Sequence, residues 1–403
     1  MRLSRERLFR DQMPVTENYA YFDHAAVAPL PRPAAKAMIQ YAQEASAQGD
    51  ADWLSWASKV KALRTSAAEL LNVSTNEVAL VNSTTQGINL VAEGMPWESG
   101  DNVLIPENEF PSNMVPWRNL NRFGVEVRSI PVGADGRITA DSFRPFLDQN
   151  TRLIALSWVG YSTGYRLDVG SIVEMAHKFQ TPKGHVLVSL DAIQGLGAFP
   201  LDASETEVDF VCADGHKWML GPEGAGVFYT KAEHLELLHP VGLGWNSLAT
   251  AGFDPYAGSE LRASLKTTAA RYEGGTTNMS GMHGFGASLR LLLDSGLNLE
   301  DSKTAESILS NVASIEDSLL KLGFEPQVPE KDSERSGIIG VLWEEAKQDA
   351  SQLAAARSFL LENGVVTSVR GGCLRISTHA YNNQDDIERL AQYLGDFRKM
   401  HKV

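Results

Sequence analysis

Short apolar runs alternate with longer amphipathic stretches over the first two thirds of the chain. Seven runs have the length and the bounding turn residues of strands: NEVALVNS (76–83), DNVLIP (101–106), VEVRSIPV (125–132), RLIALSW (152–158), HVLVSLD (185–191), VDFVCA (208–213) and AGVFYT (225–230). Several are almost wholly apolar, as is usual for parallel strands that are covered on both faces. Helical periodicity predicts helices at 32–48, 53–71, 86–93, 168–179 and 280–293. The alternation predicts an α/β fold with a mainly parallel, seven-stranded sheet.

The pattern changes after residue 280. Helical stretches at 302–322, 349–363 and 384–399 flank short apolar runs at 336–343, 364–369 and 372–377. This order is typical of a small α+β domain with an antiparallel sheet. We therefore expect a large domain over 16–279 and a smaller C-terminal domain over 280–403, with residues 1–15 packing against the smaller one.

Composition narrows the classes of partner. The 403 residues include 36 Lys and Arg against 50 Asp and Glu, a net charge of −14. So acidic a surface repels nucleic acid and anionic lipid, and we find no local basic stripe. No stretch approaches the roughly 20 apolar residues that cross a bilayer, and the N-terminal MRLSRERLFRDQ lacks the apolar core of a signal peptide. We expect a cytoplasmic protein without nucleic-acid or membrane partners.

Cysteine and histidine patterns predict neither a disulfide framework nor a metal site. The two cysteines, Cys212 and Cys373, are too few for a disulfide framework or a multi-thiolate site. The nine histidines include no HExxH motif and no pair at helical i, i+4 spacing. We therefore expect a reducing compartment and no dedicated metal.

Candidate chemistry lies just after the apolar runs, because ligands of open parallel sheets bind beyond the carboxyl ends of the strands. In NSTTQG (82–87) a strand gives way to a helix whose first N–H groups are free to bind a phosphate. Thr84, Thr85 and Gln86 are the candidate ligands. An ordinary helix N-cap is the alternative, and on this segment alone we favour it.

Two further segments place ionisable groups after buried strands. Asp191 ends the apolar HVLVSLD and needs a cation to offset its desolvation, while Gln194 follows three residues later, where it could also cap a helix. Lys217 follows VDFVCADGH, and burial there would make its amine competent for Schiff-base chemistry. A lysine on a surface turn is the alternative, which the neighbouring Trp218 argues against.

The fourth point is Arg375 within the apolar CLRIS (373–377), where its planar fork suits a carboxylate or a structural salt bridge equally well. Together, a phosphate cradle, an acid for a ring nitrogen, an amine and a carboxylate-binding arginine are the parts that pyridoxal 5′-phosphate (PLP) needs to act on an amino acid.

At this point the sequence resembles the class V aminotransferase family, which includes cysteine desulfurases, kynureninase and isopenicillin N epimerase-like enzymes. The resemblance runs from YFDHAA (21–26) to RISTHAYNNQDDIERL (375–390), and its most specific segment is DGHKWMLGPEGAG (214–226). It implies that Lys217 forms the Schiff base with PLP. DAIQ (191–194) is similar to the family's Asp-x-x-Gln, which implies that Asp191 pairs with the pyridinium nitrogen and Gln194 contacts the ring hydroxyl.

The resemblance also implies further site residues. Phe110, in ENEFPSNMVPW, would stack on the cofactor face, although a core phenylalanine is the alternative. His216 and Thr85 would contact the phosphate, and Thr276, in RYEGGTTN, would reach the phosphate of the partner subunit across a homodimer. Arg375 would hold the substrate α-carboxylate, and His24 would lie near the substrate end of the pocket.

The sequence departs from the desulfurase pattern at two places. Desulfurases of this family carry a nucleophilic cysteine on a loop well upstream of the arginine, whereas Cys373 stands two residues before Arg375, and packing is its better interpretation. Trp158 replaces a common asparagine in SWVGYSTG (157–164), a form that resembles the epimerase-like branch. We therefore expect a class V aminotransferase acting on a small amino acid, with a cysteine desulfurase-like lyase or an epimerase as alternatives and an inactive PLP-binding protein as a further one.

Overall fold

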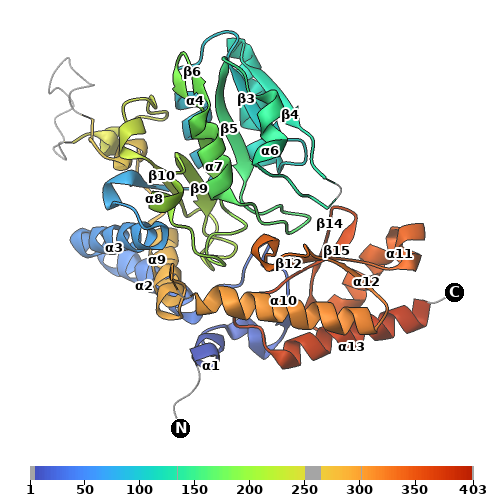
Figure 1. The fold of residues 1–403 in the computed structure, drawn as a ribbon. Helices are drawn as coiled ribbons and strands as arrows, with labels where there is room; N and C mark the ends of the chain where they lie inside the picture. The colour runs from blue at the N-terminus through green and yellow to red at the C-terminus, as the bar shows by residue number, and fades with distance from the viewer. Residues whose placement is uncertain (1–4, 134, 250–264, 301, 402–403) are drawn as a thin grey trace.

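A seven-stranded sheet forms the centre of the larger part of the computed structural model, which describes residues 5–133, 135–249, 265–300 and 302–401 (Figure 1). The sheet has the order β2-β10-β9-β8-β5-β3-β4. Its strands are β2 (Val78–Val81), β3 (Asn102–Pro106), β4 (Glu126–Ile130), β5 (Thr151–Ser157), β8 (Leu187–Asp191), β9 (Phe210–Asp214) and β10 (Gly226–Thr230). Only β10 runs antiparallel to its neighbours. The predicted α/β fold with seven mainly parallel strands is confirmed.

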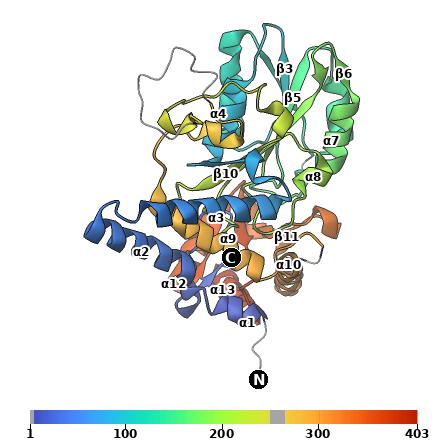
Figure 2. The same ribbon diagram turned by 90° about the vertical axis from the view of Figure 1, so that its left-hand side faces the viewer.

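Helices cover both faces of this sheet, which is why its strands are so uniformly apolar. Alternate residues of one strand enter different cores: Leu80 of β2 packs into the larger hydrophobic cluster, and Ala79 into a second cluster on the other face. The helices of this part are α2 (Arg32–Gln48), α3 (Trp53–Leu71), α4 (Thr84–Gly94), α5 (Val115–Arg118), α6 (Ala140–Phe143), α7 (Val169–Lys178), α8 (Ala203–Thr206) and α9 (Met279–Asp294). The long helices α2, α3 and α9 lie together, as Figure 2 shows.

The C-terminal part is built on a four-stranded antiparallel sheet of order β11-β12-β15-β14. Its elements are α10 (Lys303–Lys321), β11 (Glu325–Gln327), β12 (Ile338–Leu342), α11 (Glu344–Gln348), α12 (Ser351–Glu362), β13 (Val365–Val366), β14 (Ser368–Arg370), β15 (Cys373–Ser377) and α13 (Gln384–His401). A third hydrophobic cluster fills this part. The predicted run 364–369 divides into two strands, because β13 leaves the sheet to pair in parallel with β1 (Ala20–Tyr21).

The N-terminal segment contacts the C-terminal part. Arg10, the last residue of α1 (Arg5–Arg10), pairs with Asp386 at 2.6 Å, and β1 completes the two-stranded ladder with β13. The remaining two-stranded sheet is the hairpin of β6 (Gln180–Thr181) and β7 (Gly184–His185). The domain boundary between residues 279 and 280 stays a prediction, since α9 packs on α2 and α3 of the larger part.

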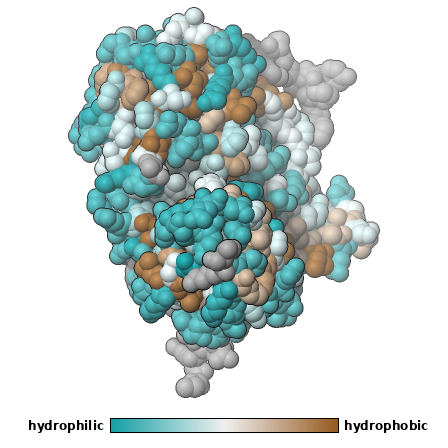
Figure 3. Space-filling view, turned by 90° about the vertical axis from the view of Figure 1, so that its right-hand side faces the viewer, coloured by the Kyte–Doolittle hydropathy of each residue, from teal (hydrophilic) through white to brown (hydrophobic). Residues whose placement is uncertain are grey.

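The exterior is mainly polar on the face shown in Figure 3, where apolar side chains occur in small groups among hydrophilic ones. Within the described ranges, none of the helices combines the length and the apolar character needed to cross a bilayer.

Candidate active site

A cavity of about 340 Å³ lies where β5, β8 and β9 end. The strand β2 delivers its own carboxyl end to the same place, because β2 and β9 both run antiparallel to β10 between them. Most of the predicted site residues line this cavity: Thr84, Thr85, Phe110, Asp191, Gln194, His216, Lys217 and Arg375. The carboxyl-end rule for parallel sheets therefore located the cavity from the sequence.

Lys217 enters the cavity from the tight turn that follows β9. The turn is closed by a hydrogen bond from the Gly221 N–H to the Gly215 carbonyl. Gly197 packs directly against it, since a Cβ at Gly197 would lie only 2.4 Å from the backbone of Trp218. The Lys217 side chain is only 9% exposed. Burial lowers the pKa of Lys217 to about 8, assisted by Arg375 and opposed by Asp191. A substantial fraction of this amine is therefore neutral near pH 8 and able to accept a proton.

Asp191 lies at the end of β8 and is 3% exposed. Its Oδ1 accepts a hydrogen bond from the Ile193 N–H at 3.0 Å. Burial raises the pKa of Asp191 to about 6, against that hydrogen bond and the charge of Lys217. The hydrogen bond and the charge of Lys217 thus do not fully offset the desolvation of the carboxylate. A cation bound beside Asp191 would be stabilised by it.

The start of α4 forms one wall. Ser83 caps the helix by accepting from the Gln86 N–H, and Thr84 Oγ1 accepts from the Asp214 N–H at 2.8 Å. Thr85 Oγ1 donates to Ser112 Oγ at 3.0 Å. His216 lies across from them, with Nδ1 3.0 Å from Asp214 Oδ1. Hydroxyls, helix N–H groups and an imidazole therefore converge where a phosphate would bind.

Arg375 forms a structural ion pair and also lines the cavity. It is 2% exposed, and its NH2 group forms an ion pair with Asp23 at 3.3 Å. Its Nε donates to Ser368 Oγ and its NH1 group to the Tyr161 carbonyl. Arg375 nevertheless lines the cavity, so the structural ion pair is present and the binding of a substrate carboxylate stays a prediction.

The two neutral candidates differ in how free they are. Gln194 is held at both ends, since its Nε2 donates to the Ala25 carbonyl and its Oε1 accepts from Trp218 Nε1. Phe110 is 41% exposed, and its ring centre lies 5.7 Å from Lys217 Nζ and 5.3 Å from the Tyr161 ring. Phe110 is therefore a wall of the cavity and not a core residue.

Three predicted site residues do not line this cavity. Gln86 instead bonds back to the chain before α4, because its Oε1 accepts from the Asn82 N–H, and it faces a second cavity that Thr276 also lines. His24 is fully buried behind the site, where Nδ1 contacts the Ser377 carbonyl at 2.8 Å and Nε2 contacts Tyr381 Oη at 2.7 Å. Both of its ring nitrogens already have partners within the protein.

Sequence reasoning missed Glu109, a buried acid beside the site. Both of its oxygens are used at 2.6 Å, one by the Ser157 N–H and one by the Ser157 hydroxyl. Burial, reinforced by Asp191, raises the pKa of Glu109 to about 7. The sequence could have indicated Glu109, since it follows an apolar strand just as Asp191 does. The resemblance instead singled out the neighbouring Phe110.

Cys212, Cys373 and Trp158 do not line the cavity. Cys212 is buried under α4 against Gly87, and Cys373 packs over Gly340 of the neighbouring strand β12. Trp158 turns into the core against Gly195. The expectation that Cys373 has a packing role agrees with this placement.

A family model described as Aminotransferase class-V matches residues 20–390. The chain belongs to the class V aminotransferase family. Among curated relatives, this class V chain is 27% identical over 413 residues to a probable cysteine desulfurase of Methanothermobacter thermautotrophicus, an alignment that covers 97% of this chain and 98% of that protein.

Solved structures share the fold over almost the whole length. A lysine-to-alanine mutant of C-DES with glycine covalently linked to the PLP cofactor has a TM-score of 0.87 and 25% identity, covering 96% of this chain and 99% of that one. A complex of C-DES, titled a cystine C-S lyase, with its reaction product cysteine persulfide has a TM-score of 0.86 and 24% identity, covering 96% and 100%. The second likeness shows the fold alone.

The residues present fit PLP, the cofactor of this family and of this chain. Asp191 offers a buried carboxylate for a protonated ring nitrogen, and Lys217 offers an amine of lowered pKa. The hydroxyls and N–H groups at the start of α4 offer a phosphate site. Within the described chain, each of these groups still has charge or hydrogen-bonding capacity that a bound cofactor could use.

Proposed function

We propose that this enzyme is a PLP-dependent C–S lyase, which removes a sulfur leaving group from Cβ of a cysteine-type amino acid by elimination. The observation that carries the proposal is that neither of the two cysteines lines the cavity. A desulfurase that loads sulfur onto its own thiol needs such a cysteine at the substrate. The similarity to cysteine desulfurases supports C–S cleavage, and the missing thiol favours sulfur leaving as a small molecule.

Binding and orientation rest on Arg375. Its guanidinium, held rigidly by Ser368 and the Tyr161 carbonyl, presents the cavity-facing side of its fork to the substrate α-carboxylate. Phe110 and Tyr161, in edge-to-face contact, close one side and limit water around the reacting atoms.

Proton transfer rests on Lys217. PLP, when bound, would supply an electron-withdrawing ring next to Cα, and Asp191 would keep its ring nitrogen protonated. Lys217 Nζ takes the Cα proton, which its lowered pKa allows near neutral pH. The Cβ–S electron pair leaves with the sulfur, as hydrosulfide from cysteine or as cysteine persulfide from cystine, and addition of one water to the remaining aminoacrylate gives pyruvate and ammonia.

The test is a product analysis of PLP-loaded protein with L-cystine and, separately, L-cysteine. We expect equal amounts of pyruvate and ammonia, with persulfide or sulfide in solution. The Cys212→Ala, Cys373→Ser double variant should keep this activity, which serves as the control. Alanine with a persulfide on the protein would assign a desulfurase. A keto acid with pyridoxamine 5′-phosphate would restore the aminotransferase expectation, and the D-enantiomer would assign an epimerase.

We also propose that the enzyme is a homodimer in which Thr276 serves the phosphate site of the partner subunit. Thr276 lies away from its own cavity, beside the exposed side chains of Trp53 and Trp245. Light scattering on the purified protein should give twice the 44.0 kDa mass of the chain. Mixing Lys217→Ala with Thr276→Ala chains should then restore one intact site per mixed dimer. A monomeric mass with full activity would contradict this.

A further inference from the structure

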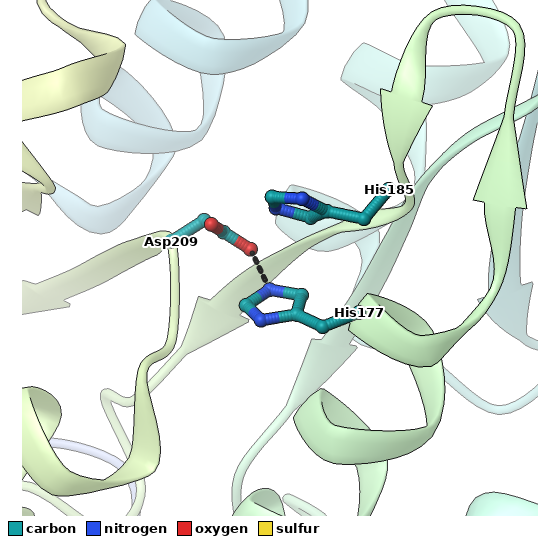
Figure 4. Close-up of side chains that lie close together, drawn as sticks. All are labelled: His177, His185 and Asp209. Carbon is teal, nitrogen blue, oxygen red and sulfur yellow. Dashed lines mark hydrogen bonds and ion pairs between the residues drawn. The ribbon is translucent and has the colours of Figure 1, made fainter.

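Three side chains with metal-ligating atoms converge where the interior strands β8 and β9 begin. We call this amino-terminal side of the large sheet the opposite edge, and the side where the strands end at the cavity the catalytic edge. His177 lies in the last turn of α7, His185 on β7, and Asp209 directly before β9. One ligand atom from each lies within 4.8 Å of those from the other two, and in the part of the chain that the structure describes no other such group occurs. Figure 4 shows the two imidazole rings and the carboxylate facing one another.

His185 brings an unpartnered atom to this cluster. Its Nε2 is buried and makes no hydrogen bond within the described chain. The His185 ring lies 4.3 Å from the His177 ring, centre to centre. A neutral imidazole offers the lone pair of one ring nitrogen, which a metal ion can accept. A buried polar atom without a partner costs stability, and a bound cation would supply the partner.

Asp209 supplies the negative charge and is itself held in place. Its Oδ2 accepts from His177 Nε2 at 3.0 Å and from the Val188 N–H at 2.8 Å. Its Oδ1 contacts His234 Nε2 at 2.8 Å. A cation that displaces the proton between His177 Nε2 and Asp209 Oδ2 would bind these two atoms after a small movement of the side chains. His234 would then orient the carboxylate from outside the site.

Other charged groups nearby do not block the cluster. Lys231 acts on His185 at longer range, and its Nζ lies 3.8 Å from Glu233 Oε1. The His177 side chain is 18% exposed, which gives a route from solvent to the cluster.

We propose that His177, His185 and Asp209 form a binding site for a divalent late first-row metal, with Zn²⁺ as the natural occupant. Two imidazole nitrogens and one carboxylate oxygen are donors that such ions prefer, and a water completes a tetrahedral set. The three ligands join the end of α7, the β6–β7 hairpin and the start of β9. The metal therefore fastens the opposite edge and takes no part in turnover at the catalytic edge.

The test is Co²⁺ and Zn²⁺ binding to the PLP-loaded protein after chelator treatment. We expect one equivalent of Co²⁺ to give the intense visible bands of a tetrahedral site, and Zn²⁺ to displace it. The His185→Gln variant, which keeps a polar side chain of similar size, should bind at least about tenfold more weakly. The matched control is His239→Gln, which removes an exposed histidine outside the cluster and should bind as wild type does.

A second measurement does not depend on the variants folding. Crystals of wild-type protein soaked in Zn²⁺ should show an anomalous peak between the three side chains. Zn²⁺ should also raise the melting temperature of wild type, but not that of His185→Gln, while leaving kcat unchanged. Stoichiometric binding that survives in His185→Gln would overturn the proposal. An anomalous map with no peak at this place would overturn it as well.

Discussion

Two buried aspartates, one at the end of β8 and one directly before the neighbouring strand β9, differ in how their charge is compensated. Asp191 at the end of β8 has a pKa raised to about 6, because burial outweighs one backbone hydrogen bond and the charge of Lys217. Asp209 before β9 experiences burial as well, but hydrogen bonds from His177 and His234 outweigh it and lower its pKa to about 2. The catalytic edge therefore leaves a charge uncompensated in the protein alone, whereas the opposite edge compensates it.

This difference separates a carboxylate whose charge needs a ligand for compensation from one whose charge the protein compensates on its own. A carboxylate that lacks partners costs stability until a cation arrives, as expected at functional sites. A carboxylate that is hydrogen-bonded from two elements stabilises the native state without any ligand. Substitutions at the two edges should therefore affect different measurements.

The largest effect on turnover is expected from Lys217→Ala at the catalytic edge. Loss of both the amine that attaches PLP and the proton acceptor should reduce kcat by at least about 10³-fold. Steady-state pyruvate formation measures this, and thermal unfolding should show a stable variant. Turnover within tenfold of wild type would show that another group accepts the Cα proton.

Asp191→Asn and Asp209→Asn form the pair that compares the edges directly. We expect Asp191→Asn to reduce kcat by about 10²- to 10³-fold, since the ring nitrogen loses its counter-charge, with little loss of stability. Asp209→Asn should instead lower the free energy of unfolding by on the order of 2 kcal/mol while kcat is kept. Equal losses of turnover in both variants would remove the distinction.

Arg375→Lys should have an intermediate effect. A lysine cannot reproduce the planar fork, so kcat/KM should fall by about 10- to 100-fold, mainly through KM. Saturation kinetics with one substrate measures this. A fall in kcat at constant KM would show that Arg375 acts on the reacting atoms and not on substrate binding.

The pH dependence of stability should differ in sign between the two edges. In PLP-free protein the folded pKa of Asp191, about 6, exceeds its unfolded value, so stability should fall as pH rises from about 4 to 6, by on the order of 2 kcal/mol. The folded pKa of Asp209, about 2, lies below its unfolded value, so its contribution is lost as pH falls from about 4 to 2. Comparing the free energy of urea unfolding of wild type with that of each Asn variant, over this pH range, isolates the contribution of each aspartate.

The smallest effect is expected from Cys373→Ser. Because Cys373 packs over Gly340 outside the cavity, kcat should stay within about twofold and stability within about 0.5 kcal/mol. Pyruvate formation and urea unfolding check this in one preparation. A large loss of activity would return Cys373 to the substrate.

The sequence predicted the strands well, because uniformly apolar runs such as 152–158 leave little alternative in a chain of this kind. It also placed Asp191 and Lys217, since both follow such runs. The histidine pair at 177 and 185 was not predictable, because a hairpin and not a helical turn brings the rings together. Whether His24 enters the cavity depended on Ser377 and Tyr381, more than 350 residues away, for which periodicity gives no information.

Gln86 shows the limit differently. The spacing Ser83-x-x-Gln86 is that of a capping box. In the structure Ser83 caps the helix, while Gln86 accepts from the Asn82 N–H, one residue before the cap. The residue preferences of helix starts predicted a cap here, while the position after a parallel strand predicted a phosphate ligand. Thr84 and Thr85 line the cavity, so one short segment served both purposes through different residues.

The position of β10 between β2 and β9 sets the order in which this protein becomes competent during synthesis. β2 pairs with no other strand of the sheet, so it waits unpaired while about 145 further residues leave the ribosome. Only when β10 inserts do Thr84 and Lys217 come into register, and Arg375 arrives later still. A nascent chain shorter than this exposes a strand edge that invites aggregation, so truncations before residue 230 should depend strongly on chaperones.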